Sequence, residues 1–365
     1  MYVNGVFPAQ WLSKALDDGS ILTPSVADAA LQPASLDLRL GDRAYRLRCS
    51  FLPDADTVET KLDRYGMESL DLRDGAILER NRPYLIPLVE GLALPDGVRA
   101  RTNPKSSIGR LDVFTRVITD HSHRFDEIVE GYAGLMWLEV VSRSFTIKVR
   151  SGQSLNQLRL VAGDARVVDA EILEVHRAEP VLLRDDRPVA PSDVSLSDGL
   201  FLSLDLRREP FVGYRARKNS RLLDLTSPEL LEADDFWEPV PSERGDRLVL
   251  EPEEFYLLIS AEGVRIPPGF AAEMTAYDPT SGELRTHYAG FFDPGFGYEP
   301  EDPSHSSRAV LEVRAHDVPF MIEHELKVCR LRFERMLEPP SILYGAGIGS
   351  SYQGQVAMLS KFFRR

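Results

Sequence analysis

Residues 35–40 read Ser-Leu-Asp-Leu-Arg-Leu, in which every second residue is leucine. Alternation of this kind places the leucines on one face of an extended chain and predicts a half-buried β-strand. The first five of these residues return in the same order at 203–207. A pattern that occurs in both halves of a 365-residue chain indicates two related units.

Two further segments support an internal duplication. Residues 84–86, Tyr-Leu-Ile, are echoed by Tyr-Leu-Leu at 256–258, and Leu-Glu-Val at 138–140 returns at 311–313. The spacing between the copies is nearly the same for all three pairs. We therefore expect two tandem units over residues 1–185 and 186–365, joined within the polar stretch 184–198.

The local pattern predicts mainly strands. Residues 145–150 alternate as residues 35–40 do, and 25 glycines and 25 prolines are scattered along the chain, which suits many short strands and turns. Helices are expected only over residues 8–18 and 58–65 and from Ser227 onward, where Ser-Pro-Glu is typical of a helix start. The predicted class is all-β, with barrel or sandwich units and a few short helices.

The composition excludes several kinds of partner. Lys and Arg number 43 against 57 Asp and Glu, so the formal net charge is −14. Broad binding to nucleic acid polymers or anionic membranes requires an excess of Lys and Arg. The two cysteines, Cys49 and Cys329, are too few for a disulfide framework or a Cys-rich zinc site. Without a signal-peptide pattern or a long apolar stretch, we expect a cytoplasmic protein that acts on a small molecule.

Several familiar catalytic motifs do not occur in the sequence. No GxxxxGK[ST] phosphate loop is present, and the glycine-rich stretch 345–349 follows no strand-to-helix unit. His324-Glu325 lacks the second histidine of HExxH, and the HxE and PCxxC signature of zinc nucleobase deaminases is missing. Any deamination by this chain would therefore proceed without zinc.

The densest polar cluster lies between Lys105 and Glu139. Residues 105–110, Lys-Ser-Ser-Ile-Gly-Arg, offer several donors to phosphate oxygens, although a solvated turn with a helix cap explains the same residues. Residues 121–126, His-Ser-His-Arg-Phe-Asp, suit either the edge of a polar pocket or a surface loop. Glu139 lies in an apolar strand, where burial would suit its carboxyl group to proton transfer, unless alternation turns it outward.

The order of these motifs resembles dCTP deaminase of the dUTPase-like superfamily, in its long tandem form. The resemblance is carried by the segments 34–41, 58–64, 106–110, 123–126 and 138–139. It implies two tandem dUTPase-like units, each a distorted β-barrel or jelly roll, assembled as trimers with sites between subunits. It also implies hydrolytic removal of the 4-amino group of dCTP to give dUTP and ammonia, with Mg²⁺ bound to the triphosphate and no zinc.

The resemblance assigns roles to individual residues. Glu139 matches the glutamate that activates water and passes its proton to the leaving amine. Ser106 is expected near phosphate and water, and Arg110 is expected to support the charge around the glutamate. Further substrate-binding positions follow from the same match, with the last three residues in a C-terminal tail that closes over the nucleotide: Lys105, Ser107, His123, Arg124, Gln157, Tyr352, Gln355 and Lys361.

Two departures from the family pattern are visible. After Asp126 the usual Asp-Pro-Gly-aromatic-x-Gly loop is replaced by a longer segment that lacks the proline. The second half keeps that loop at 293–297 and has Glu312 at the glutamate position, but it carries Asp278 in place of Lys105 and Arg330 in place of Gln157. An acid would oppose a triphosphate, so we expect one type of working site, in the first half.

Two other functions remain open at this stage. A dUTPase-type pyrophosphatase, or a bifunctional enzyme that converts dCTP to dUMP, would use the same fold and would release pyrophosphate. A degenerate relative would bind nucleotide as a sensor or serve as a trimeric scaffold. Release of ammonia would indicate deamination, and release of pyrophosphate would indicate cleavage of the phosphoanhydride. Unchanged dCTP would indicate a role in binding alone.

Overall fold

The structure is a computed structural model, and it describes residues 4–25, 30–227, 230–276, 284–286, 290–315, 317–345 and 358–364. The described residues form two compact units. Unit 1 consists of Met1–Ala165, Lys218–Glu232 and Ser360–Arg365, and unit 2 consists of Arg166–Arg217 and Ala233–Leu359. Two short segments from the second half of the sequence therefore belong to unit 1.

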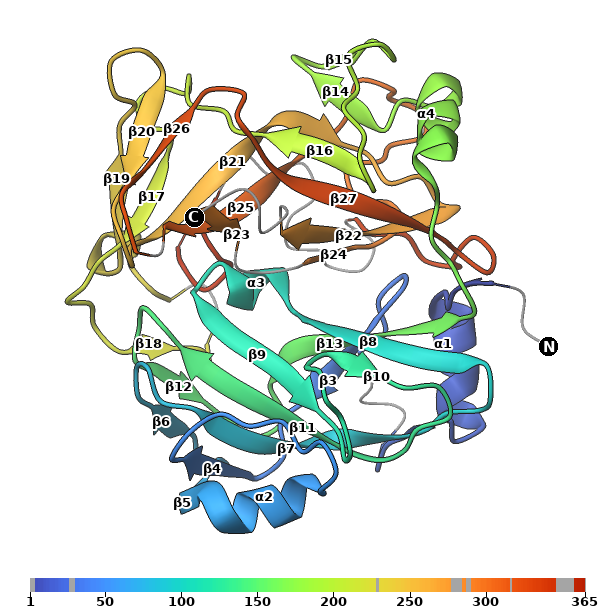
Figure 1. Cartoon of the computed structure of the whole chain (residues 1–365), viewed down its shortest axis with the longest axis vertical. Coiled ribbons are helices and arrows are strands. Elements are labelled where there is room, and N and C mark those ends of the chain that lie inside the picture. Colours follow the sequence, from blue (N-terminus) through green and yellow to red (C-terminus); the bar gives the residue numbers. More distant parts are fainter. Residues whose placement is uncertain are drawn as a thin grey trace. The chain divides into compact units, whose positions relative to one another are not determined.

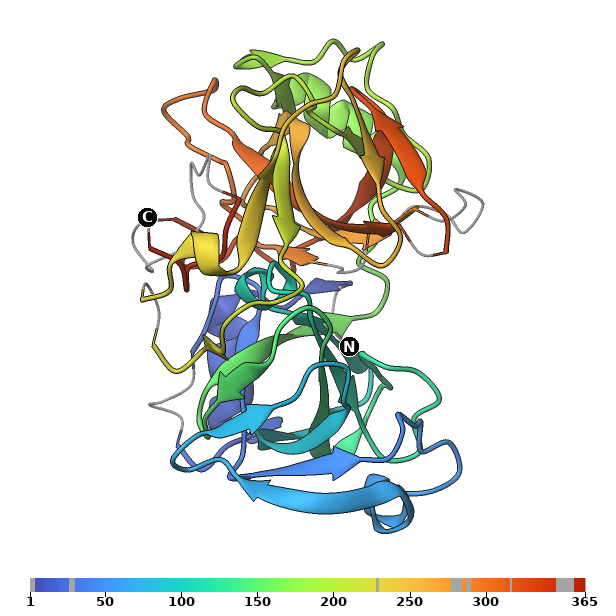
Figure 2. The same cartoon turned by 90° about the vertical axis from the view of Figure 1, so that its left-hand side faces the viewer.

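Unit 1 is built from three sheets, whose strands curve around a common interior (Figures 1 and 2). One sheet has the order β1-β13-β8-β10 with β3 on β13, where β1 is Gly5–Val6, β13 Ser154–Ala162, β8 Val98–Pro104, β10 Glu127–Ile128 and β3 Leu36–Arg39. The second has the order β5-β4-β7-β11-β9 with β2 on β7, where β5 is Gly66–Asp71, β4 Arg43–Leu47, β7 Tyr84–Ala93, β11 Ala133–Ser142, β9 Val113–Ile118 and β2 Ile21–Leu22. The third joins β18, Leu223–Asp224, to β12, Ile147–Val149, and β6, Ala76–Leu78.

Unit 2 repeats this construction. Its largest sheet has the order β15-β14-β21-β17-β19, with β25 on β21 and β23 on β25, where β15 is Arg187–Pro188, β14 Leu182–Arg184, β21 Phe255–Val264, β17 Gly213–Ala216, β19 Trp237–Val240, β25 Ser307–Ala315 and β23 Leu284–Thr286. The next has the order β16-β27-β22-β24, with β16 Leu200–Ser203, β27 Lys327–Arg335, β22 Phe270–Ala276 and β24 Gly290–Phe292. A two-stranded sheet pairs β20, Arg247–Leu250, with β26, Phe320–Glu323. The prediction of an all-β chain is confirmed.

The described helices are few and short. α1, Ala9–Asp17, buries Leu12 and Leu16 on one face, as the apolar spacing predicted. α2, Val58–Tyr65, is capped by the preceding Thr57, whose hydroxyl accepts a hydrogen bond from the Thr60 amide. The remaining helices are α3, Ser106–Gly109, α4, Asp169–Ala178, and the 3-10 turn η2, Ala233–Asp235. The helix expected from Ser227 falls partly outside the described residues. Among the described helices, none is both long and apolar enough to cross a membrane.

The register of the strands shows the duplication. Glu139 of β11 lies opposite Leu85 of β7, and Glu312 of β25 lies opposite Leu257 of β21. The two glutamates therefore occupy corresponding positions, as the repeated Leu-Glu-Val segments indicated.

The repeated pentapeptide is not in corresponding register. Arg39 of β3 pairs with Ser154 of β13. In unit 2, Ser203 of β16 pairs with Lys327, which occupies the position on β27 that Ser154 occupies on β13. Both backbone amides donate to a buried carboxylate, Arg39 to Glu90 and Ser203 to Glu262. Arg39 thus corresponds to Ser203, and the second Ser-Leu-Asp-Leu-Arg begins where the first ends.

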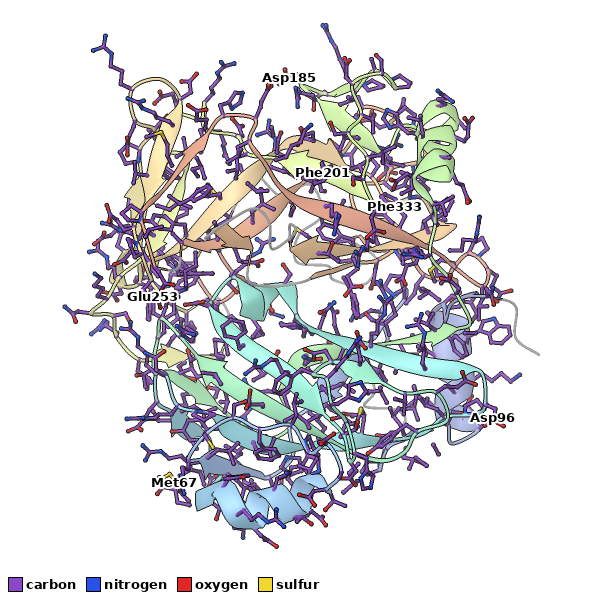
Figure 3. All side chains as sticks on the ribbon, viewed as in Figure 1. Met67, Asp96, Asp185, Phe201, Glu253 and Phe333 are labelled. Carbon is purple, nitrogen blue, oxygen red and sulfur yellow. The ribbon has the colours of Figure 1, made fainter. Side chains whose placement is uncertain are left out.

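Most of the buried side chains are apolar. In unit 1 a cluster of Leu47, Val58, Leu85, Ile118 and Trp137 joins α2 to the six-stranded sheet. In unit 2, Phe333 of β27 is buried in the larger core cluster. Met67 lies on the outer strand β5 and is 64% exposed (Figure 3).

Candidate functional site

Glu139 is buried in the middle of a central strand. It belongs to β11, between β7 and β9, and none of its side chain is exposed. On β9 the residue directly opposite is Arg116. A carboxylate in such a place is costly unless a cation or hydrogen-bond donors compensate for its lost hydration.

Arg116 supplies that cation. Its Nη2 donates to Glu139 Oε1, while Glu139 Oε2 is buried and has no hydrogen-bond partner in the described part of the chain. The guanidinium of Arg116 lies 4.1 Å from the ring centroid of Phe125 and 5.7 Å from that of Phe114. The two oxygens of the carboxylate therefore differ, because Arg116 holds only one of them.

The Lys-Ser-Ser segment forms the single turn α3 and the residue before it. Ser107 and Arg110 are buried and Ser106 is exposed. Lys105 forms an ion pair with Asp37 Oδ2. Of the three side chains, therefore, only that of Ser106 is exposed to solvent.

The end of the chain is bound to the same segment. The Ser360 hydroxyl donates to the Ser107 carbonyl over 2.7 Å, and Phe363 is buried where its backbone bridges to Leu231. Burial lowers the pKa of Lys361, and the nearby Lys105 ammonium lowers it further, while Asp37 opposes this shift. A second lysine thus lies close to Lys105, within unit 1.

Gln157 lies beside these charges. It occupies β13, opposite Asp37 on one side and Asn103 on the other. Ser35 donates a hydrogen bond to Gln157 Oε1 over 3.4 Å. The predicted binding residues Lys105 and Gln157 are therefore linked through Asp37.

The His-Arg-Phe-Asp segment is divided between the interior and the surface. His123 and Arg124 are exposed, and Arg124 forms an ion pair with Glu127 over 3.0 Å. Asp126 accepts hydrogen bonds from the Thr102 hydroxyl and the Val117 amide, which fixes the turn. The segment after Asp126, which differs from the family pattern, begins with β10, and this strand pairs with β8.

Some site residues could not be found from the sequence alone, and others lie outside the described residues. Arg116 and Phe125 are missing from the predicted set because their closeness to Glu139 depends on strand register and on the fold of the 119–126 turn. Tyr352 and Gln355 fall outside the described range, and so does Asp278 of the second half. Glu312 is buried at the position that corresponds to Glu139.

No dedicated metal site is formed within the described ranges, where His, Cys, Asp and Glu side chains nowhere gather in threes with a geometry that could hold an ion. Both described cysteines are free thiols, Cys49 exposed and Cys329 buried.

Comparison with known proteins gives concordant results. Residues 3–164 match the family model for the N-terminal domain of 2'-deoxycytidine 5'-triphosphate deaminase, and residues 168–363 match that for its C-terminal domain. The crystal structure of 2'-deoxycytidine 5'-triphosphate deaminase from Agrobacterium tumefaciens is similar, with a TM-score of 0.84 and 41% identity. The match covers 93% of this chain and 99% of that one.

Shorter relatives match less than half of the chain. A protein of Corynebacterium kroppenstedtii named "dCTP deaminase, dUMP-forming" is 31% identical over 157 residues, which is 42% of this chain and 77% of the relative. A protein of Methanosphaera stadtmanae with the same name is 30% identical over 139 residues, 35% of this chain and 64% of the relative.

Proposed function

Because this chain belongs to the 2'-deoxycytidine 5'-triphosphate deaminase family, we propose that it hydrolyses dCTP to dUTP and ammonia at a site centred on Glu139. The observation that carries the proposal is the state of that carboxylate. It is completely buried, one oxygen is held by Arg116, and the other has no partner among the described residues. That oxygen is where an attacking water would bind.

The proposed chemistry requires one carboxylate to act three times. Glu139 takes a proton from the water as its oxygen bonds to C4 of the cytosine. It gives that proton to N3, and then transfers the second proton of the added hydroxyl group to the departing amine. Each transfer is general acid–base catalysis at one oxygen. Water supplies the oxygen of the uracil, and the amino group leaves as ammonia.

Lysine side chains are proposed to bind the triphosphate. Lys105 and the neighbouring Lys361 form a cationic pair beside the exposed Ser106 hydroxyl, although Asp37 neutralises one of the two charges. A Mg²⁺ ion bound to the triphosphate would add positive charge there. Through the family resemblance we assign Ser107, Gln157, His123 and Arg124 to substrate binding, and Arg110 to the charge around Glu139. We also expect a homotrimer in the cytoplasm whose subunits complete one another's sites.

A second product is favoured by one specific observation. Both shorter relatives described above carry names that specify dUMP formation. Formation of dUMP would require cleavage of the phosphoanhydride after deamination, with release of pyrophosphate. The deamination step at Glu139 is common to both outcomes.

Replacement of the carboxylate tests the proposal. Glu139→Gln keeps the size of the side chain and removes the proton acceptor, so we expect loss of ammonia release while dCTP still raises the Tm of the protein. Glu68→Gln, on the exposed strand β5, is the matched control and should leave turnover unchanged. Full activity of Glu139→Gln would refute the assignment.

A further inference from the structure

Arg116 occupies a position that the family motif does not assign to the site. The motif supplies Arg110, which is buried next to α3. The side chain that contacts the central carboxylate is instead Arg116, directly across from Glu139 in the β9–β11 ladder. Facing positions in an antiparallel pair bring side chains close together without any long loop.

The orientation of Arg116 is set by an aromatic ring. Phe125 lies 4.1 Å from the guanidinium, a distance at which a cation is attracted to the face of the ring. Phe125 is itself held in place. It packs against the apolar cluster defined above by Leu47, Val58, Leu85, Ile118 and Trp137.

The neighbouring residue fixes the backbone of Phe125. Asp126 has a φ of 63° and its Oδ1 accepts from the Thr102 hydroxyl over 2.6 Å and from the Val117 amide over 2.8 Å. Val117 follows Arg116 on β9. One carboxylate therefore ties the turn that carries Phe125 to the strand that carries Arg116.

We infer that Arg116 is a positioning residue for Glu139 and that Phe125 orients it. The guanidinium occupies Oε1 and leaves Oε2 as the oxygen that exchanges protons with water and substrate. Arg116 itself neither gains nor loses a proton during the reaction. Its fixed charge compensates for the hydration that the buried carboxylate has lost, which a neutral side chain could not do to the same extent. This inference rests on the proposed deamination.

Substitutions at the two positions distinguish positioning from bulk stability. The variants are Arg116→Gln, Arg116→Lys and Phe125→Leu, with Arg73→Gln as the control, because Arg73 forms an exposed ion pair with Asp71. Each is assayed for ammonia release from dCTP to give kcat and KM, and for the dCTP-induced rise in Tm.

We expect Arg116→Gln to lower kcat by about 100-fold, within the range of general acid–base effects, with KM changed by less than about threefold. Arg116→Lys keeps the charge but loses the planar fork and its stacking, so its kcat should lie between those of Arg116→Gln and the wild type. Phe125→Leu should lower kcat by about 10-fold. Arg73→Gln should match the wild type.

Three outcomes would overturn the inference. A wild-type kcat in Arg116→Gln would show that Glu139 needs no partner. Equal loss of kcat in the Lys and Gln variants, together with loss of the dCTP-induced Tm rise, would show a purely structural role. If Arg116→Gln does not fold, unchanged kcat values in Arg116→Lys and Phe125→Leu would reject the inference that Arg116 positions Glu139. Absence of ammonia release by the wild type would instead refute the proposed function, and the inference with it.

Discussion

The ion pair between Arg116 and Glu139 makes a quantitative prediction for stability. Glu139 is completely buried, whereas the Arg116 side chain is 33% exposed. Removing Arg116 leaves a carboxylate alone in an apolar strand, but removing Glu139 leaves a cation that still reaches water. Loss of one partner of a fully buried pair costs about 3–5 kcal/mol. Because exposed pairs contribute only about 0.2–1 kcal/mol, the partial exposure reduces the expected cost of Arg116→Gln to about 2–3 kcal/mol.

A double-mutant cycle measures this asymmetry. Glu139→Gln alone should cost less than about 1 kcal/mol, since its neutral amide can still accept from Arg116. The double variant should be close to Glu139→Gln, so the coupling should equal the cost of Arg116→Gln alone, about 2–3 kcal/mol. Urea unfolding at pH 7.5, followed by circular dichroism, supplies the free energies of unfolding. The exposed pair of Asp71 and Arg73 is the control cycle, with an expected coupling below about 1 kcal/mol. Additive effects at Arg116 and Glu139 would refute the reasoning.

Three other features give simple predictions. Thr57→Ala removes the hydroxyl that caps α2 and should lower the free energy of unfolding by about 1 kcal/mol; an unchanged Tm would contradict this. The exposed Cys49 should react with a thiol reagent in the native protein, whereas Cys329, whose pKa burial raises, should react only after unfolding, and equal rates would be evidence against its burial. Burial raises the pKa of Tyr132 from 10 to about 12. The free energy of unfolding should therefore fall as the pH rises from 10 to about 12, because the unfolded chain loses this proton first. Tyr132→Phe should make that fall less steep.

Local chemistry explains which elements could be predicted. α2 was expected over residues 58–65 and the structure has it at Val58–Tyr65. The alternating leucines of residues 35–40 do form the buried face of β3 and the bridge that follows it. The equivalence of Glu139 and Glu312 also follows from the repeated segments. Each glutamate lies between the same two residues, leucine and valine, so the repeated Leu-Glu-Val segments align the two strands.

Register and long-range contacts could not be predicted in the same way. The second Ser-Leu-Asp-Leu-Arg is displaced from the position of the first, because leucine alternation fits a strand equally well after a shift of an even number of residues. The pairing of Arg116 with Glu139 depends on the register of β9 against β11, which no local pattern marks. The binding of Ser360 to Ser107 joins residues that are far apart in the sequence.

The product of the reaction is the most direct test of the central claim. The purified 365-residue chain is incubated with dCTP and Mg²⁺, and nucleotides and ammonia are resolved by chromatography, with Glu139→Gln in parallel. We expect a uracil nucleotide with one equivalent of ammonia from the wild type and neither from the variant; dUTP would indicate deamination alone and dUMP with pyrophosphate both steps. A wild-type protein that is folded and leaves the cytosine intact, or a variant that still releases ammonia, would contradict the claim.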